Sequence, residues 1–251
     1  MSALDNVGER LAPSNDTPFL LEPLPPSGYA ANVTSAVRSR VFVDGLGAVG
    51  GTRKRLADLF IASVALILLA PLMIILCALV KLAVGGPILY RHTRIGLGGI
   101  RFECYKFRTM AADADGILIR HLAHDPEAAR EWSEHRKLRD DPRVTMFGRI
   151  LRKSSLDELP QLFNVLKGEM SCVGPRPIVS AELARYGPSA VNYLQARPGI
   201  TGIWQVSGRN SLRYEERVAL DTHYVKNWSL GMDWAILAKT IVAVLEIQNT
   251  S

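Results

Sequence analysis

Residues 59–80 read LFIASVALILLAPLMIILCALV, and this apolar stretch decides how the rest of the chain is interpreted. It contains no charged side chain. A straight helix of this length would be about 33 Å long, which is enough to cross the hydrocarbon core of a bilayer. A signal peptide would be shorter, would lie at the extreme N-terminus and would end in a cleavage site, so we interpret the stretch as a membrane segment.

Pro71 divides this membrane segment into two parts. Proline removes a backbone donor and clashes with the preceding helical turn, so it kinks a helix. The residues before it, 59–70, would span only about 18 Å as a helix, which is too short to cross a bilayer. We therefore predict a re-entrant helix–break–helix over residues 56–84 that dips into one leaflet, with its break at Pro71. The alternative is an ordinary transmembrane helix with a proline kink.

The basic residues support the re-entrant prediction, because they flank the segment on both sides. They are Arg53, Lys54 and Arg55 before it, and Lys81, Arg91 and Arg94 after it. Lys and Arg accumulate on the cytoplasmic side of a membrane segment, so both ends are predicted to be cytoplasmic.

The net charge of the 251 residues is +6, and the excess of basic side chains is concentrated around the apolar segment. Residues 53–109 hold nine basic and two acidic side chains (+7), whereas residues 1–50 hold three basic and five acidic ones (−2). A nucleic-acid-binding protein is disfavoured, because the cations flank an apolar segment and stacking aromatics are few. The three cysteines and five histidines show no metal-binding spacing.

The composition divides the chain into a flexible tail, residues 1–50, and one membrane-anchored domain, residues 51–251. We predict an α+β fold that is mainly helical with a small β-hairpin. The hairpin is expected within residues 87–110, around a turn at residues 96–99. The main helices are expected after Asp125, within 143–153 as a basic amphipathic helix, from about Asp157 to Gly168, and over 232–247.

Asp157 and Glu158 are adjacent acids at a predicted helix start. Backbone N–H groups at such a start favour an ionised carboxylate and also attract phosphate. The structural alternative is helix capping, because Ser155 and Glu158 fit the spacing of a capping box.

Cations close to this acidic pair favour a chemical role. Arg152 and Lys153 come just before it, and Arg176 lies between Pro175 and Pro177, which restrict the backbone and orient the guanidinium. Arginine is suited to bidentate phosphate contacts. Acids beside oriented cations next to a membrane anchor indicate phosphoryl chemistry on a lipid-linked substrate.

Several longer strings then resemble one family, the monotopic phosphoglycosyl transferases, also called bacterial sugar transferases. The strings are KRLADLFIASVALILLAPLMII, LYRHTRIGLGGIRFECYKFRTM, SLDELPQLFNVLKGEMSCVGPRP and RPGITGIWQVSGR. The resemblance runs from about Thr52 to the C-terminus and is greatest to exopolysaccharide-priming undecaprenyl-phosphate galactose or glucose phosphotransferases. Members often carry Ser-Pro at the membrane break, where this chain has Ala70-Pro71.

The resemblance implies roles for individual residues. Asp157 would be the nucleophile that attacks the β-phosphate of a UDP-hexose, releases UMP and holds the phosphosugar covalently, before undecaprenyl phosphate accepts it. Glu158 would bind Mg²⁺. The residues expected to contact phosphate or substrate are Lys106, Arg108, Arg152, Arg176, Arg197 and Arg209.

The same resemblance implies a bacterial inner membrane protein whose catalytic domain faces the cytoplasm. Its expected partners are UDP-galactose or UDP-glucose, undecaprenyl phosphate and the membrane, with no nucleic acid; homodimerisation is left open. The alternative function is a non-catalytic basic scaffold at the membrane surface, which would not need Asp157, Glu158 or Arg176.

Overall fold

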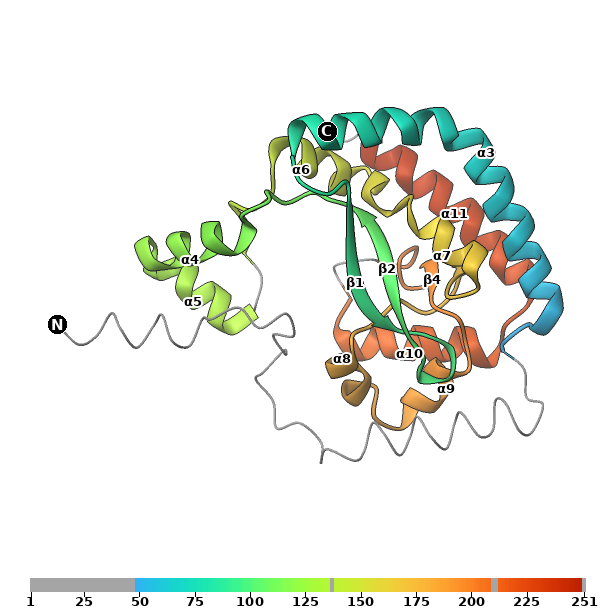
Figure 1. Ribbon diagram of the computed structural model, residues 1–251. Coiled ribbons are helices and arrows are strands. Elements are labelled where there is room, and N and C mark those ends of the chain that lie inside the picture. Colours follow the sequence, from blue (N-terminus) through green and yellow to red (C-terminus); the bar gives the residue numbers. More distant parts are fainter. Residues whose placement is uncertain (1–47, 136–137, 209–211, 250–251) are drawn as a thin grey trace.

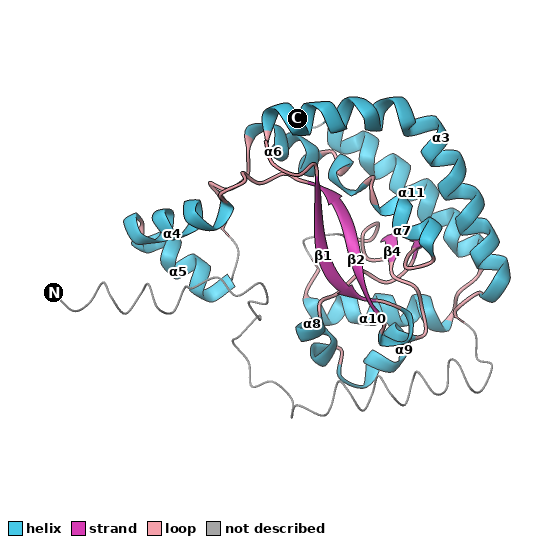
Figure 2. Ribbon diagram, in the orientation of Figure 1, coloured by secondary structure: helices cyan, strands magenta, loops and turns pink. Residues whose placement is uncertain are grey.

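The computed structural model describes residues 48–135, 138–208 and 212–249 (Figure 1). Helices dominate, and they surround a two-stranded antiparallel sheet and a two-stranded parallel sheet (Figure 2). The predicted α+β class with a small β-hairpin is confirmed. The predicted tail lies outside the described residues up to position 47, and the backbone N–H of Val49 already donates to the carbonyl of Gln195 in the domain.

The predicted membrane segment forms helix α3 (Gly51–Ala83). Pro71 lies inside this helix, which continues past it without interruption. Instead of breaking, the helix bends, so that its two halves run in different directions (Figure 1). The predicted helix–break–helix is therefore corrected to one bent helix, because a proline removes one hydrogen bond of a turn while the neighbouring bonds persist.

Both halves of α3 pack on the same folded domain. The buried residues of the first half are Lys54, Asp58 and Ala62, and those of the second half are Met73, Leu76 and Val80. A straight helix crossing a bilayer would place its two ends about 30 Å apart on opposite sides. The contacts at both ends are compatible with the monotopic, re-entrant arrangement.

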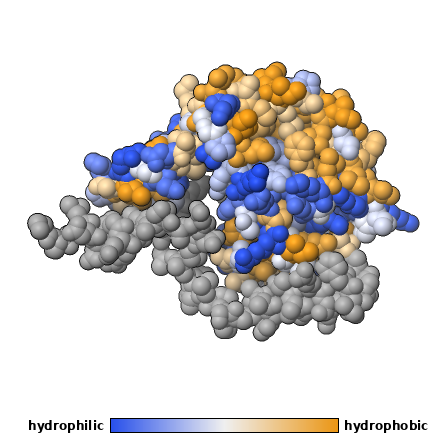
Figure 3. Space-filling view, viewed as in Figure 1, coloured by the Kyte–Doolittle hydropathy of each residue, from blue (hydrophilic) through white to orange (hydrophobic). Residues whose placement is uncertain are grey.

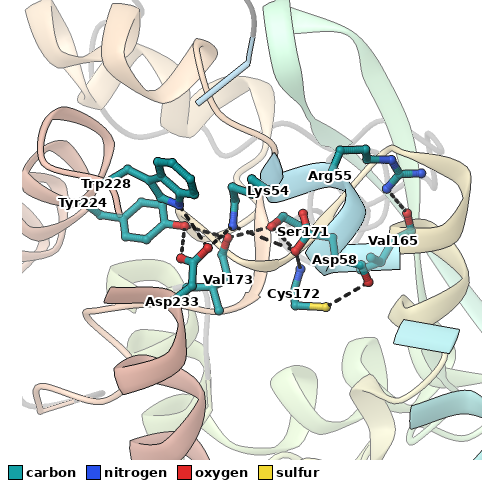
Figure 4. A network of polar contacts seen from close by, with 10 residues as sticks. All are labelled: Lys54, Arg55, Asp58, Val165, Ser171, Cys172, Val173, Tyr224, Trp228 and Asp233. Atoms are coloured by element: carbon teal, nitrogen blue, oxygen red, sulfur yellow. Dashed lines mark hydrogen bonds and ion pairs between the residues drawn. The ribbon is translucent and has the colours of Figure 1, made fainter. Parts of the chain in front are cut away.

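A buried polar network fastens the first half of α3 to the domain (Figure 4). Lys54 Nζ lies 2.7 Å from Oδ2 of Asp233. This oxygen also accepts a hydrogen bond from Trp228 Nε1, and Oδ1 accepts one from the Tyr224 hydroxyl. Asp58 accepts hydrogen bonds from the hydroxyl of Ser171 and the backbone N–H of Cys172.

This network changes the interpretation of the basic residues that precede α3. Lys54 is 5% exposed, and Arg55 donates to the carbonyls of Val165 and Leu166 at the end of α7 (Gln161–Lys167). Of the three cations on this flank, Arg53 alone is exposed. Lys54 and Arg55, two of the cations from which a cytoplasmic flank was predicted, therefore make contacts inside the domain.

The predicted hairpin is formed by β1 (Leu89–Ile95) and β2 (Arg101–Phe107), which pair antiparallel. The glycines of the turn are needed, since Gly98 and Gly99 have φ values of 63° and 79°. His92 pairs with Cys104 and Tyr90 pairs with Lys106, so these side chains project from one face of the hairpin.

The helix signals in the sequence are largely confirmed. Asp125 caps α5 (Pro126–His135) by accepting two backbone N–H groups, and Gly168, with φ of 84°, ends α7. The basic amphipathic helix α6 (Met146–Lys153) is shorter than predicted, because Thr145 is its N-cap. The remaining elements are α4 (Ala114–His124), β3 (Ser171–Val173), α8 (Ser180–Arg185), α9 (Ala190–Leu194), β4 (Gly199–Thr201), α10 (Tyr214–Lys226) and α11 (Leu230–Asn249).

Many large apolar side chains remain exposed on α3, α6 and α11, and we call the following set the apolar surface. Its members are Leu56, Phe60, Val64, Ile67, Leu68, Ile74, Ile75, Leu79 and Leu82 of α3, Met146 and Ile150 of α6, and Trp234, Ile241 and Val242 of α11. Figure 3 shows hydrophobic residues gathered over α3 at the top of the molecule, above a band of hydrophilic ones. Exposed apolar area of this extent marks a membrane or protein contact.

Candidate active site

Asp157 and Glu158 lie in a short 3₁₀ turn, η2 (Leu156–Glu158), between α6 and α7. The predicted helix start at Asp157 is therefore this turn, and the α-helix itself begins at Gln161. Ser155 adopts a left-handed conformation (φ of 57°) and makes no capping hydrogen bond, so the capping-box alternative is wrong. A serine at positive φ is strained, and such strain often occurs at functional positions.

Asp157 is 8% exposed, which is unusual for a carboxylate. Its pKa is raised to about 6: burial raises it most, the positive charge of Lys106 opposes this, the negative charge of Glu158 raises it, and Arg152 lowers it. The carboxylate is thus ionised near pH 7 but more basic than an exposed aspartate, which suits a nucleophile.

Lys106 joins the hairpin to the acidic turn. Its Nζ, at the end of β2, lies 2.5 Å from Oε1 of Glu158. Both side chains keep about a third of their surface exposed, at 30% and 35%. The site is therefore open to a substrate beside a buried nucleophile.

Arg152 is held by Thr109, whose hydroxyl accepts a hydrogen bond from Arg152 Nε at 2.9 Å. The carbonyl of Thr109 accepts the backbone N–H of Thr145, just before α6. A Cβ at Gly148 would lie only 2.0 Å from this carbonyl oxygen, so the close approach of α6 requires glycine. Thr109, which the sequence did not single out, thus positions Arg152.

Arg176 projects from the loop that follows β3 and is exposed. The loop is fixed at its base, where Gly174 N donates to Thr201 O and Gly199 N donates to Pro175 O. The guanidinium lies 5.3 Å from the ring centre of Trp204. A cation–π contact of this kind restricts the side chain.

The charged groups that act on the buried thiol of Cys104 are close to one another. Burial raises the pKa of this thiol; the charge of Glu158 adds to this, and those of Lys106, Arg94 and Arg176 oppose it. The structure therefore brings together four of the predicted site residues, Asp157, Glu158, Lys106 and Arg152, and places Arg176 close to the same cluster.

Two further residues of this cluster, His92 and Arg94, were missed by the sequence analysis. Burial lowers the pKa of His92 to about 4, with contributions from Arg94 and Lys106, so its imidazole is neutral at pH 7. Arg94 Nη1 donates to the carbonyl of Pro177 and lies 3.7 Å from Glu182. The alternation of the predicted hairpin was the available signal, because it places both on the same face as Lys106.

The other predicted phosphate contacts lie elsewhere. The Arg108 side chain packs near Gly86, beyond the end of α3. Arg197 donates from Nε to the carbonyl of Gly168 at 2.8 Å, which completes the C-terminus of α7. Arg209 lies outside the described residues.

The side chains at this site fit the predicted Mg²⁺ in one respect, the number of carboxylates. Within residues 48–135, 138–208 and 212–249, no three His, Cys, Asp or Glu side chains converge on one point. Mg²⁺ is commonly bound through only one or two carboxylates together with substrate phosphates and water. Asp157 and Glu158 fit that mode of binding, with Glu158 the more exposed of the two.

Known proteins resemble this chain over most of its length. The family model described as "Bacterial sugar transferase" matches residues 49–247. The exopolysaccharide production protein ExoY of Sinorhizobium fredii is 55% identical over 78% of this chain and 87% of its own length.

Two relatives carry names that specify a reaction. The undecaprenyl-phosphate galactose phosphotransferase of Salmonella typhimurium is 54% identical over 76% of this chain, and the match covers 40% of that longer protein. The UDP-glucose:undecaprenyl-phosphate glucose-1-phosphate transferase of Caulobacter vibrioides is 42% identical over 78% of this chain and 71% of its own length.

Proposed function

We propose, since this chain belongs to the bacterial sugar transferase family, that it transfers hexose-1-phosphate from UDP-galactose or UDP-glucose to undecaprenyl phosphate and releases UMP. The reaction would begin the synthesis of an exopolysaccharide repeat unit, in keeping with the relatives' names. The observation that carries the proposal is Asp157, a buried carboxylate with a raised pKa beside Glu158 and two cations.

In the first step, an Oδ atom of Asp157 attacks the β-phosphorus of the UDP-hexose. The new P–O bond to Asp157 forms as the bond to UMP breaks, and UMP leaves with the electron pair. Lys106 and Arg152, whose charges act on Asp157, would offset the negative charge on the transferred phosphoryl group, which is the main requirement of such a transfer.

In the second step, a phosphate oxygen of undecaprenyl phosphate attacks the same phosphorus. The bond to Asp157 breaks, its carboxylate is regenerated, and undecaprenyl-diphospho-hexose leaves. One nucleophile thus divides a difficult displacement into two. Mg²⁺, held by Glu158 with Asp157, would supply further charge neutralisation for the phosphates.

The membrane placement is part of the same proposal. The apolar surface on α3, α6 and α11 would lie in the cytoplasmic leaflet of the inner membrane, with α3 re-entering on one side. Undecaprenyl phosphate, whose lipid chain stays in that leaflet, would then reach Asp157 from the membrane. A non-catalytic scaffold would explain the apolar surface, but it would not require a buried carboxylate among cations.

The test is UMP release by detergent-solubilised full-length protein, with Mg²⁺ and undecaprenyl phosphate, across UDP-galactose, UDP-glucose and their N-acetylated counterparts. We expect release with UDP-galactose or UDP-glucose, none with Asp157→Asn, and unchanged release with Asp140→Asn, an exposed control. Label from the β-phosphate should remain on the wild-type protein when undecaprenyl phosphate is omitted. Absence of UMP with every UDP-sugar would overturn the proposal.

A further inference from the structure

Asp221 is a buried carboxylate that the proposed chemistry does not use. It lies on α10 and is 2% exposed. Its Oδ2 accepts a hydrogen bond from the hydroxyl of Tyr186 at 2.8 Å, while Oδ1 is buried without a hydrogen bond of good geometry from the described residues. Keeping such a group inside a domain is costly, so its retention calls for a reason.

The loop that carries Arg176 supplies that reason. Burial raises the pKa of Asp221 to about 7, and this effect is opposed by the Tyr186 hydroxyl, then by the backbone N–H and the positive charge of Arg176. Asp221 therefore lies close to Arg176, whose side chain is exposed, and α10 also reaches the base of this loop through the hydrogen bond from the Tyr224 hydroxyl to the carbonyl of Val173.

A second contact joins α10 to the same loop. Arg217 precedes Asp221 by four residues, so both lie on one face of the helix. Its guanidinium lies 5.0 Å from the ring centre of Trp204, and that of Arg176 lies 5.3 Å from the same ring. Trp204 is 4% exposed and thus forms a rigid platform between the two arginines.

The opposite side of the loop is held by the hairpin and by α9. Arg94 donates to the carbonyl of Pro177, and the backbone N–H of Ile178 donates to the hydroxyl of Tyr193. Pro177 and Ile178 are therefore held by Arg94 and Tyr193. Arg176 lies beside Asp221 and Trp204.

We propose that Asp221 is a positioning residue for Arg176, holding its backbone while Trp204 supports its guanidinium, so that Arg176 meets a phosphate of the nucleotide sugar in one orientation. This inference rests on the proposed function for its substrate. The physical benefit is preorganisation: a free arginine side chain loses rotamer entropy when it is fixed, and a misplacement of about 1 Å can reduce a rate about 100-fold.

The first test is a double-mutant cycle on UMP release. Asp221→Asn preserves shape and removes the charge; we expect it to lower kcat/KM by about 10- to 100-fold in the wild-type background. In an Arg176→Ala background the same change should cost less than about threefold, because its effect passes through Arg176. Equal losses in both backgrounds would overturn the proposal. Asp115→Asn, an exposed carboxylate on α4, is the matched control.

The second test does not depend on activity. Amide hydrogen exchange of the full-length protein should accelerate by about tenfold or more at residues 174–178 in Asp221→Asn, and should stay unchanged in β1 and β2. Unchanged exchange at residues 174–178 would overturn the positioning role. Should wild-type protein release no UMP, the proposed function fails, and this measurement still decides the role of Asp221.

A milder variant covers the case in which Asp221→Asn does not fold. Tyr186→Phe removes the hydroxyl that holds the carboxylate but keeps the ring that packs against Tyr193 and Tyr214. We expect it to accelerate exchange at residues 174–178 in the same direction, and protection equal to that of the wild type would count against the proposal.

Discussion

The Nζ of Lys106 lies 2.5 Å from Oε1 of Glu158, and this ion pair connects the end of β2 to the turn that holds Asp157. Lys106 lowers the pKa of Asp157, whereas Glu158 raises it. The pair is partly exposed, so its contribution to stability is small. Its importance lies in controlling the charge of the buried carboxylate next to it.

This relationship predicts the pH dependence of the transferase. The nucleophile must be ionised, so the rate of the first step should fall as pH drops through about 6, the pKa of Asp157. Lys106→Met should move the midpoint to higher pH and Glu158→Gln to lower pH, because they remove charges of opposite sign. The measurement is UMP release in a single turnover between pH 5 and pH 8. Identical midpoints in both variants would contradict this electrostatic account.

Asp157→Asn should make the protein inactive but more stable. The pKa of Asp157 is higher in the folded than in the unfolded state, so folding is favoured by the protonated form and opposed by the ionised one. The gain should be on the order of 1–3 kcal/mol above pH 6 and should shrink as pH falls toward 4. Thermal unfolding of both proteins at pH 4.5 and pH 7.5 tests this, and a gain that is larger at the lower pH would show the sign to be wrong.

Gly148→Ala should damage both stability and activity. The added Cβ would lie 2.0 Å from the carbonyl oxygen of Thr109, so α6 must move away from the residue that positions Arg152. We expect a loss of about 1–3 kcal/mol in the free energy of unfolding. Gly231→Ala is the control, because its Cβ would meet only Ser229 Oγ, at 3.9 Å. Equal melting temperatures for the two variants would contradict the packing argument.

Lys54→Met should be strongly destabilising. Lys54 lies 2.7 Å from Asp233 and 3.9 Å from Asp58, and all three side chains are buried. Its removal leaves two buried carboxylates without their cation, at a cost of about 3–5 kcal/mol. Arg53→Met removes an exposed charge next to it and should be nearly neutral. Scanning fluorimetry in detergent compares the two variants, and similar melting temperatures would refute an internal role for Lys54.

The apolar surface predicts which substitutions weaken membrane binding. Ile150→Lys on α6 and Ile241→Lys on α11 place a charge where a leaflet is expected, and together they should markedly lower the bound fraction in flotation with anionic vesicles. Ile119→Lys is matched in chemistry and also changes an exposed isoleucine, but it lies on α4, outside this surface. Loss of binding in this control as well would indicate general destabilisation.

Local patterns in the sequence were enough for much of the fold. Asp125 before Pro126, Gly168 after α7 and the glycines between β1 and β2 act through backbone conformation and neighbouring N–H groups. The parallel pairing of β3 with β4 was not predicted, because three-residue strands carry too little pattern. Their close approach depends on Gly174 and Gly199, where a Cβ would meet backbone atoms of the other segment.

Some residues of the candidate site were likewise predicted from the sequence, and others were not. Asp157, Glu158, Arg152 and Arg176 were predicted from neighbouring charges and prolines, and Lys106 was predicted from the resemblance. Thr109 and Asp221 were missed because their hydrogen bonds join distant segments. His92 and Arg94 were also missed, although the alternation of the hairpin places them on the same face as Lys106. Arg197, for which the resemblance implies a phosphate contact, donates from Nε to the carbonyl of Gly168 after α7, a contact that the sequence did not indicate.

The sequence by itself determined that this protein has one long apolar segment with a proline at its middle, a β-hairpin, and acids followed by a proline-flanked arginine. These are properties of neighbouring residues, governed by hydrophobicity and backbone sterics. Only the tertiary structure decided that Lys54 is an internal ion-pair partner, that α3 bends without breaking, and that Asp157 is buried beside two cations from other segments, Lys106 and Arg152. The reason is that burial and charge–charge interaction depend on which distant segments meet.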